Sequence, residues 1–451
     1  MTEAGATGRG VTGRPPTEVR VPGDKSIGHR ALIVASLAPA PVAISGLPDA
    51  ADVRSTAGAL AASGAGIDWA AGSSRAVVTP PVAWRQGATI DAGNSGTSAR
   101  LLIGLFAGLG LAAVFDGDAS LRRRPMDRIV YPLQAMGAKI EYAGEPELLP
   151  VRLAARATGH LRVLRYRSRV ASAQVKSALV LAALTAGVEF EMWEPARSRD
   201  HTERLLRHLG VPIEFGPEGD GSHLRLPAGA RDGLAARDLS VPSDPSSAAF
   251  LLAAGVLGGR PVSVDGLLLN ETRTAYLEAL ELFGADVEIE PAGDVAGEPV
   301  GRVTAGPVGS GSGSGLRAIE LGPAGMPALI DEIPVLAVLA ARAEGVTVIR
   351  GAGELRVKES DRLVALAANL RALGVTVDER PDGLAIHGRP DLVPVGRVAT
   401  HGDHRIAMAF GVLGAVPGAD VRVDDPDCVA VSFPGFWGEL ARLGAGREKP
   451  S

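Results

Sequence analysis

Two cations stand at the start of an apolar segment in the stretch VPGDKSIGHR, residues 21–30. Lys25 and Arg30, with Ser26 between them, directly precede the run ALIVASLA, which we predict to be helical. The first turn of a helix exposes unpaired N–H groups and the positive end of the helix dipole, where an anion is favourable and a cation is not. A lysine and an arginine at this position therefore predict an anion-binding site.

Three further segments combine a cation with a predicted helix start: GNSGTSAR at 93–100, ELRVKESDR at 354–362 and GDHRIAM at 402–408. Serine, aspartate and asparagine are common helix caps in any protein, so capping alone explains DPSSAAF at 244–250, which has no cation. Capping requires no lysine or arginine. We therefore interpret the cationic starts as parts of anion sites.

Lysine is rare in this chain. Of 46 Lys and Arg residues only five are lysine, so a retained lysine can mark a site that needs a compact, mobile ammonium. We expect this for Lys25 and Lys358, which lie in dense polar clusters, and we expect Lys139 and Lys449 to be surface residues. The fifth lysine is Lys176.

Several common catalytic motifs are absent from the sequence. The GDKS stretch is not a Walker P-loop, because the required glycines are replaced by Val19 and Asp24. The eight histidines show no zinc-ligand spacing, and His401 and His404 have no matching pair. No Gly-x-Ser-x-Gly nucleophile elbow occurs.

The elements that must position these residues recur along the chain. Six segments, starting at residues 42, 113, 188, 262, 346 and 421, share a short β-branched strand, a polar loop, an amphipathic helix and a glycine turn. The longest spacing contains the flexible insert VGSGSGSG at 308–315. Six copies of one α/β unit are a stronger signal than any single motif.

A second, strongly apolar helix is predicted before each unit. These helices belong in a core, yet their starts are polar and rich in small residues, as in ASAQVKSALVLAALTAG and IDEIPVLAVLAARAEG. If three such helices run parallel in each domain and the two sets face one another, several positive helix ends meet at one anion site.

Composition limits the class of protein. A chain of 451 residues with 46% apolar residues predicts two domains, and no apolar run is long enough to cross a bilayer. The first 18 residues have no apolar core of a secretory signal and are predicted to be a frayed tail. The single cysteine, Cys428, fits a reducing cytoplasm, and the net charge of −5 argues against a nucleic-acid partner.

The motifs together resemble one enzyme family. VPGDKSIGHRAL, GNSGTSARLL, LRRRPM, SAQVKSALVLA, SRDHTERLL, IDEIPVLAVLA, ELRVKESDRL, GDHRIAMAF and SFPGF occur in the order found in 5-enolpyruvylshikimate-3-phosphate synthases. The resemblance covers about residues 19–443, and SRDHTER, DEIPVLAV and RVKESDR are similar to the class II bacterial branch.

The resemblance implies an α/β enolpyruvyl transferase fold, an inside-out α/β barrel of two similar domains with three βαβαββ repeats each. One domain would comprise residues 1–22 and 245–451 and the other residues 24–241, with hinge crossings near 22–24 and 241–244. The family also implies a monomer that closes over its substrates. Together with the composition and the histidine spacing, this leads us to expect a cytoplasmic protein without cofactor or metal that binds neither nucleic acid nor membrane.

The reaction implied is transfer of the carboxyvinyl group of phosphoenolpyruvate to the 5-hydroxyl of shikimate 3-phosphate, with release of phosphate, on the route to chorismate and aromatic amino acids. By match to the family motifs, shikimate 3-phosphate would be bound by Lys25, Ser26, Arg30, Ser172, Gln174, Ser198, Asp331 and Lys358. Phosphoenolpyruvate would be bound by Lys25, Gly96, Arg124, Gln174, Arg362 and Arg405. Guanidinium groups suit this task because they pair with phosphate and carboxylate oxygens.

Two carboxylates could divide the proton chemistry. We predict that Asp331 accepts the proton of the 5-hydroxyl and that Glu359 delivers a proton to the methylene carbon, with Lys25 assisting. The alternative is that Asp331 only caps a helix and Glu359 only pairs with a cation.

Two departures and two rival interpretations accompany the resemblance. Val431 stands where class I enzymes have a lysine that reaches phosphoenolpyruvate, and Leu101 replaces a common class I proline, so glyphosate affinity is left open. UDP-N-acetylglucosamine enolpyruvyl transferases typically have a cysteine where this chain has GDASLRRRP, and an asparagine where it has Ser26. A non-catalytic anion-binding scaffold would lose Asp331 and Glu359, which are both present.

Overall fold

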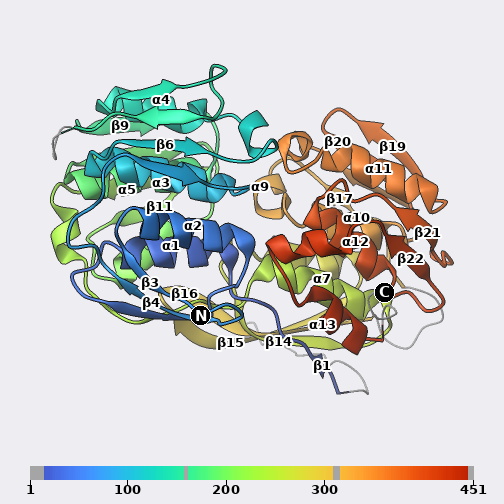
Figure 1. Cartoon of the computed structure of the whole chain (residues 1–451). Coiled ribbons are helices and arrows are strands. Elements are labelled where there is room, and N and C mark those ends of the chain that lie inside the picture. Colours follow the sequence, from blue (N-terminus) through green and yellow to red (C-terminus); the bar gives the residue numbers. More distant parts are fainter. Residues whose placement is uncertain (1–14, 157–160, 308–314, 445–451) are drawn as a thin grey trace. The chain divides into compact units, whose positions relative to one another are not determined.

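A computed structural model describes residues 15–156, 161–307 and 315–444 (Figure 1). Residues 1–14 of the predicted tail, most of the VGSGSGSG insert and Lys449 lie outside the described residues. The chain forms two compact units. The continuous unit comprises Pro22–Pro242 and the short stretch Asp294–Glu298, and the discontinuous unit comprises the described residues up to Val21, Ser243–Gly293 and those from Pro299 onward.

The continuous unit contains three four-stranded sheets and six α-helices within its described residues. The strands are β2 (Val42–Ser45), β3 (Gly66–Asp68), β4 (Arg75–Thr79), β5 (Ala88–Asp91), β6 (Ala113–Asp116), β7 (Ile140–Tyr142), β8 (Val151–Leu153), β9 (Leu164–Arg167), β10 (Phe190–Glu194), β11 (Glu214–Glu218), β12 (Gly221–Leu226) and β13 (Leu239–Ser240). The helices are α1 (Lys25–Ala35), α2 (Ala51–Ala62), α3 (Gly96–Leu109), α4 (Asp127–Met136), α5 (Ala173–Ala186) and α6 (His201–His208), with short 3-10 helices η1 (Leu121–Arg123) and η2 (Ala230–Gly233).

The discontinuous unit repeats the pattern. Its strands are β1 (Thr17–Glu18), β14 (Val262–Leu268), β15 (Asp286–Val295), β16 (Glu298–Gly306), β17 (Glu320–Leu321), β18 (Val346–Ile349), β19 (Thr376–Arg380), β20 (Gly383–His387), β21 (Val395–Val398) and β22 (Asp420–Val423). Its helices are α7 (Pro245–Leu257), α8 (Ala275–Phe283), α9 (Met326–Leu329), α10 (Ile333–Ala340), α11 (Arg362–Ala372), α12 (His404–Leu413) and α13 (Phe436–Arg442), with η3 (Gly353–Val357) and η4 (Pro426–Val431).

Each four-stranded sheet has the same topology. The strand orders are β13-β2-β4-β3, β5-β6-β8-β7, β11-β12-β10-β9, β1-β14-β16-β15 and β17-β18-β20-β19. In the second of these, β5 pairs parallel with β6 and β8 pairs antiparallel with both β6 and β7. The sixth repeat is shorter, because its sheet consists of the parallel pair β21-β22 in the described residues.

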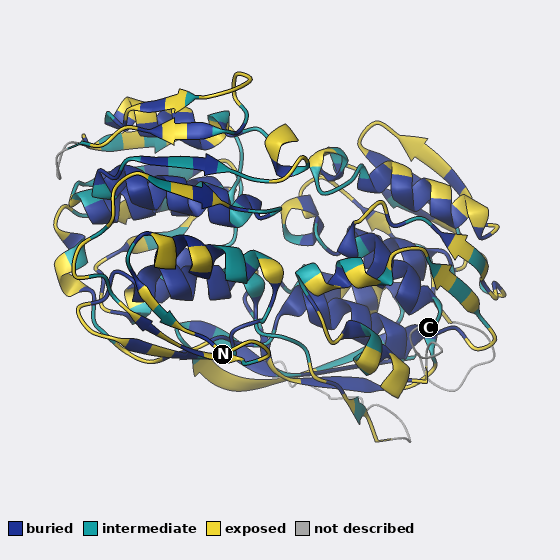
Figure 2. Cartoon of the chain, viewed as in Figure 1, coloured by how far each residue is buried: buried dark blue, intermediate teal, exposed yellow. Residues whose placement is uncertain are grey.

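The strongly apolar helices form the two cores, as their sequences predict. In the continuous unit α3 and α5 pack backbone to backbone, since a Cβ added at Gly104 would lie 2.1 Å from the Ala178 carbonyl oxygen, and one at Gly108 would lie 2.3 Å from that of Ala182. Figure 2 shows these helices largely buried. The glycines thus permit a contact that any side chain would block.

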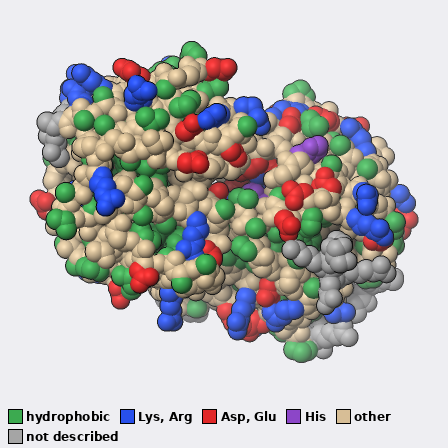
Figure 3. Space-filling model, in the orientation of Figure 1, with side chains coloured by type: hydrophobic (Ala, Val, Ile, Leu, Met, Phe, Trp, Pro, Cys, Tyr) green, Lys and Arg blue, Asp and Glu red, His purple; other side chains and the backbone are tan. Residues whose placement is uncertain are grey.

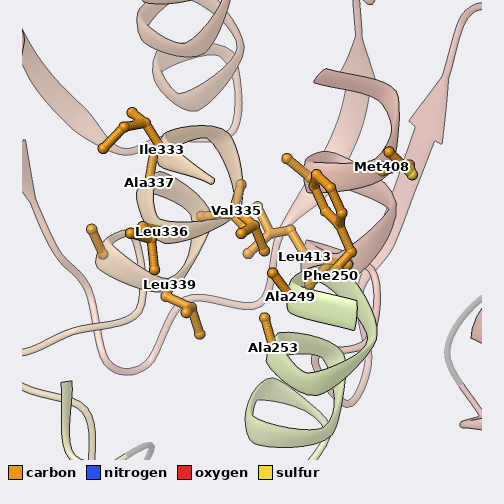
Figure 4. Close-up of a cluster of buried hydrophobic side chains, with 14 of the residues drawn as sticks. Ala249, Phe250, Ala253, Ile333, Val335, Leu336, Ala337, Leu339, Met408 and Leu413 are labelled. Atoms are coloured by element: carbon orange, nitrogen blue, oxygen red, sulfur yellow. The ribbon is translucent and has the colours of Figure 1, made fainter. Parts of the chain in front are cut away.

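The core of the discontinuous unit is built from α7, α10 and α12. Ala249 and Phe250 of α7 lie near Val335 of α10 and Leu413 of α12 (Figure 4). Phe250 also meets Phe436 of α13 edge to face, with ring centroids 6.3 Å apart. These contacts fix α10 and α12, whose starts lie next to the predicted site residues Asp331 and Arg405.

Cations are dispersed over the surface seen in Figure 3, where Lys and Arg side chains lie in small groups among Asp and Glu side chains. An anionic ligand must therefore be recognised by a local cluster. Within the described residues, no helix is long and apolar enough to cross a membrane.

Candidate active site

Polar caps hold the starts of the three core helices in the continuous unit. The side chains of Asp24, Ser95 and Ser172 accept hydrogen bonds from the first turns of α1, α3 and α5. Lys25, the first residue of α1, donates to Asp52 in the first turn of α2, with 2.9 Å between Nζ and Oδ2. This ion pair keeps the ammonium group at the helix start.

Gln174 joins the starts of α3 and α5. Its Oε1 accepts from Nη1 of Arg100 at 2.9 Å, and its Nε2 donates to Oγ1 of Thr97 at 3.0 Å. A Cβ at Gly96 would lie 2.6 Å from Nη1 of Arg100 and 3.5 Å from Nη1 of Arg124. Glycine at 96 therefore lets two guanidinium groups approach one helix start, as a phosphate or carboxylate ligand would require.

Arg30 is the most enclosed cation of this unit's candidate site. Its Nε and Nη2 donate to Oγ1 of Thr202 and Oγ of Ser177, each at 2.7 Å, and its Nη1 donates to the backbone oxygen of Ser26 at 2.8 Å. Burial lowers the pKa of Arg30 to about 10, so the group stays charged at neutral pH. Arg30 thus connects α1 with α5 and α6.

His29 adds no charge to this cluster. It is fully buried, and its Nδ1 lies 2.7 Å from Oγ1 of Thr56. Burial lowers its pKa to about 3, with Lys25 and Arg30 acting in the same direction against the opposite effect of Asp52. The imidazole is therefore neutral beside two cations.

Ser172 and Ser198 share one partner. The backbone N–H of Ser172 donates to Oε1 of Glu194 at 3.0 Å, and the hydroxyl of Ser198 lies 2.8 Å and 2.9 Å from the two oxygens of the same carboxylate. These two residues, far apart in sequence, are thereby brought to one place.

A buried arginine organises the candidate site of the discontinuous unit. Arg362, the first residue of α11, has an exposed fraction of 1% and donates to Asp403 at 2.7 Å and to Glu359 at 2.5 Å. Burial alone would lower the pKa of Arg362, but the two carboxylates outweigh it and raise the pKa. The guanidinium therefore remains a permanent cation.

Asp331 lies between two arginines. Its Oδ1 is 3.9 Å from Nη1 of Arg362 and its Oδ2 is 3.8 Å from Nη2 of Arg405, which also donates to the Asp331 backbone oxygen at 2.6 Å. Asp403, the cap of α12, accepts from the backbone N–H of Arg405 at 2.9 Å. Burial opposes ionisation of Asp403, but Arg362 lowers its pKa overall. The neighbouring cations favour ionised carboxylates throughout this cluster.

Lys358 differs from Arg362 and Arg405, the two arginines of this candidate site, which are paired with carboxylates. It is half-buried at the end of η3 and has no ion pair within 4.0 Å among the residues that the structure covers. Its ammonium group can therefore bind an anionic ligand without first breaking an ion pair with a carboxylate.

One cluster in the described residues has the composition of a metal site. Ligand atoms of Asp200, His201 and Glu298 lie within 4.8 Å of one another. Arg204 supplies a cation there, 2.9 Å from Asp200 and 3.8 Å from Glu298. This guanidinium already neutralises the carboxylates and would repel a metal ion, so the geometry does not favour one.

Comparison with known proteins identifies the family. The family model described as EPSP synthase (3-phosphoshikimate 1-carboxyvinyltransferase) matches residues 12–440. This chain belongs to the EPSP synthase family. Relatives named 3-phosphoshikimate 1-carboxyvinyltransferase agree: that of Phenylobacterium zucineum is 46% identical over 99% of this chain and 96% of the relative. That of Thermus thermophilus is 48% identical over 94% and 96%.

Solved structures support the fold. An EPSP synthase from Acinetobacter baumannii is 35% identical with a TM-score of 0.81, covering 95% of this chain and 96% of that chain. The enolpyruvyl transferase NikO from Streptomyces tendae shares the fold at a TM-score of 0.71 and 20% identity, covering 96% and 95%. The predicted family and the predicted α/β enolpyruvyl transferase fold are confirmed, and the UDP-N-acetylglucosamine enolpyruvyl transferase alternative is set aside.

The EPSP synthase site residues predicted from sequence are divided between the two units. The continuous unit holds Lys25, Ser26, Arg30, Gly96, Arg124, Ser172, Gln174 and Ser198, and the discontinuous unit holds Asp331, Lys358, Glu359, Arg362 and Arg405. In the discontinuous unit, ion pairs link Asp331, Glu359, Arg362 and Arg405. In the continuous unit, Arg30 bonds to the backbone of Ser26, and Ser172 and Ser198 share Glu194. The ligand assignments of all these residues remain predictions. Leu101, where class I enzymes have proline, is fully buried in α3.

Sequence reasoning missed three residues of this network. Arg100 is the cation of GNSGTSAR, a segment that we interpret as part of an anion site, but the family motifs assign no ligand role to this residue. Glu194 and Lys176 lie at a strand end and inside an apolar helix, where the sequence gives no sign of a shared contact. Only the fold brings Glu194 to Ser172 and Ser198.

Proposed function

We propose that this protein transfers the carboxyvinyl group of phosphoenolpyruvate to the 5-hydroxyl of shikimate 3-phosphate and releases phosphate. The observation that carries the proposal is the EPSP synthase family match, which spans both units of the chain. Cations at capped helix starts support it, because both substrates are multiply anionic. The chemistry uses protons and fixed charges, so no metal or cofactor is required of the protein.

The two candidate binding sets suit the two anions. Arg124, with its Nη1 near Gly96, and Arg362 and Arg405 are proposed to hold phosphoenolpyruvate, since guanidinium groups bind its phosphate and carboxylate in pairs of hydrogen bonds. Ser172 and Ser198 are proposed to hold the phosphate of shikimate 3-phosphate. Lys25 and Gln174 are proposed to contact both substrates.

Asp331 is the proposed acceptor of the hydroxyl proton. As the 5-hydroxyl oxygen attacks the second carbon of phosphoenolpyruvate, its proton leaves and another proton must reach the methylene carbon. Arg362 and Arg405, each within 3.9 Å of the Asp331 carboxylate, favour the ionised form that can accept a proton. In the second step the carbon–oxygen bond to phosphate breaks and the new methyl group returns a proton.

Glu359 is the proposed donor of the proton to carbon. In the structure its carboxylate pairs with Arg362 at 2.5 Å, which favours the ionised form, so Glu359 must be protonated before it can donate. An anionic substrate bound to Arg362 would compete for this guanidinium and raise the proton affinity of Glu359. Lys25 is proposed to assist from its place at the start of α1.

The choice of acceptor substrate tests the proposed function. Purified protein is incubated with phosphoenolpyruvate and either shikimate 3-phosphate or UDP-N-acetylglucosamine, and released phosphate is measured. We expect release only with shikimate 3-phosphate. Release only with UDP-N-acetylglucosamine would overturn the proposal, and no release with either acceptor would support a non-catalytic scaffold.

A further inference from the structure

Lys176 is a buried lysine for which the proposed function gives no role. It lies inside α5 with an exposed fraction of 2%, and its Nζ is 2.8 Å from Oε2 of Glu194 and 2.8 Å from Oε1 of Glu203. Both glutamates are also buried. Burial alone would lower the pKa of Lys176, but the two carboxylates raise it, so an ammonium group is held in the core.

Glu194 extends this ion pair to the proposed phosphate ligands. One oxygen, Oε1, accepts from the backbone N–H of Ser172 at 3.0 Å and from the hydroxyl of Ser198 at 2.8 Å. The other oxygen, Oε2, faces Lys176 and accepts from the hydroxyl of Ser222 at 3.1 Å. Lys176 also donates to the backbone oxygen of Ser198 at 3.5 Å.

We infer that Glu194, oriented by Lys176, is a positioning residue that fixes Ser172 and Ser198 for binding the phosphate of shikimate 3-phosphate. The inference rests on the proposed function and on the proposed roles of the two serines. Glu194 ends β10, Ser172 caps α5, and Ser198 lies in the loop before α6. The Glu194 carboxylate connects this strand, this helix start and this loop through hydrogen bonds.

Only a carboxylate satisfies every neighbour of this side chain. An amide at position 194 has one oxygen and one NH2 group. If its oxygen faced Ser172, the NH2 group would face the Lys176 ammonium, and if its oxygen faced Lys176, the NH2 group would face the Ser172 N–H. Either orientation sets two donors against each other in the core, where an unmade hydrogen bond is costly.

Glu203 provides the matched comparison. It pairs with the same lysine through Oε1, but its Oε2 has no hydrogen-bond partner in the described part of the chain. It also borders a cavity of about 200 Å³, which has room for water. Burial raises the pKa of Glu203 despite Lys176, so a neutral side chain is tolerated better there. Glutamine at 203 can keep its oxygen on Lys176 and turn its NH2 group away.

The experiment compares Glu194→Gln with Glu203→Gln, which remove the same charge beside the same lysine. KM for each substrate and kcat are measured, with folding checked by thermal unfolding. We expect Glu194→Gln to raise KM for shikimate 3-phosphate about tenfold or more, with KM for phosphoenolpyruvate within about threefold, and Glu203→Gln to leave both within about threefold. Equal effects of the two substitutions, or none, would overturn the inference.

A second variant covers the case in which Glu194→Gln does not fold. Glu194→Asp keeps the charge beside Lys176 but is one methylene group shorter, so it cannot reach both that lysine and the serines. We expect KM for shikimate 3-phosphate to rise in the folded variant, and an unchanged KM would contradict the inference. If the unmodified protein shows no activity with shikimate 3-phosphate, the proposed function fails instead.

Discussion

Lys25 carries a compact ammonium group at a position where arginine would place a larger, planar guanidinium group. Its ammonium is fixed by one ion pair with Asp52 at 2.9 Å, at the start of a buried helix. Lys25→Arg keeps the charge but adds bulk and a planar fork, so we expect turnover to fall about tenfold or more. Steady-state kinetics measures this. Lys139→Arg, at an exposed lysine, is the control, and equal turnover of the two variants would show that the site does not require lysine.

Asp331 and Glu359 are predicted to carry protons. Asp331→Asn and Glu359→Gln should each reduce kcat about 100-fold or more, the scale expected for a lost acid or base, and should retain measurable affinity for shikimate 3-phosphate. Calorimetric binding and single-turnover kinetics separate these effects. If both variants turn over within a few-fold of the parent, the two carboxylates serve only the ion pairs with Arg362 and Arg405.

His29 is predicted to make folding stability depend on pH. Its pKa is lowered from 6.5 to about 3 by burial, so below pH 6.5 the unfolded chain binds a proton that the folded chain does not. Stability should therefore fall as the pH drops from about 6.5 towards 3, by up to about 1.4 kcal/mol per pH unit from this group. Chemical denaturation of His29→Asn should show a slope smaller by about one proton. An unchanged slope would mean that the imidazole is not buried neutral.

At the scale of single residues, the cations of the candidate site could be predicted from the sequence better than their hydrogen-bond partners. Lys25, Arg30, Arg362 and Arg405 were identifiable because cations at helix starts contradict the helix dipole. The carboxylates that hold other residues of the site, such as Glu194, were not, because hydrogen bonds depend on the fold: Glu194 and Ser172 are 22 positions apart. No local pattern encodes that pairing.

At the scale of elements, α3 and α5 cross with their backbones in contact. Gly104→Ala would place a methyl group 2.1 Å from the Ala178 carbonyl oxygen, so we expect a loss of about 1–3 kcal/mol. Gly58→Ala, inside α2 with no atom within 4 Å of the new Cβ, should instead stabilise by about 0.5–1 kcal/mol. Thermal unfolding of the two variants should shift in opposite directions, and a shift in the same direction would contradict this packing.

The repeated elements were largely predictable from periodicity, because each apolar helix and each β-branched strand has a local signature. The sixth repeat shows the limit of this reasoning. Its strand and helix appear at β22 and α13, but its sheet has two strands in the described residues, where the other five sheets have four. Whether a hairpin completes a sheet depends on residues beyond the repeated pattern.

On the scale of the whole molecule, the chain forms two compact units, and one short stretch groups differently from the predicted division. The sequence-based boundaries assign everything after residue 245 to one domain, yet Asp294–Glu298 groups with the continuous unit. The reason is local: Oε1 of Glu298 accepts a hydrogen bond from Nδ1 of His201 at 2.7 Å, and Gly297 packs against the Arg204 backbone. Asp294 and Glu298 lie at the turn between β15 and β16, and their sequence does not predict that they group with the continuous unit.

The division of the proposed ligands between two units predicts a change in compactness. Because residues proposed to bind one substrate come from both units, we expect shikimate 3-phosphate to bring the units together and exclude water. Small-angle scattering should show a smaller radius of gyration with ligand than without it. An unchanged radius at saturating ligand would count against hinge closure at 22–24 and 241–244.

The proposed transfer can be tested most directly by following every phosphorus atom of the reaction. Purified protein is mixed with equal amounts of phosphoenolpyruvate and shikimate 3-phosphate, and phosphorus NMR is recorded over time. We predict that both substrate signals fall together while inorganic phosphate and one new phosphate ester appear in equal amounts. Phosphate appearing without the new ester would indicate hydrolysis of phosphoenolpyruvate, and unchanged substrate signals would indicate no transfer; either result would contradict the proposed function.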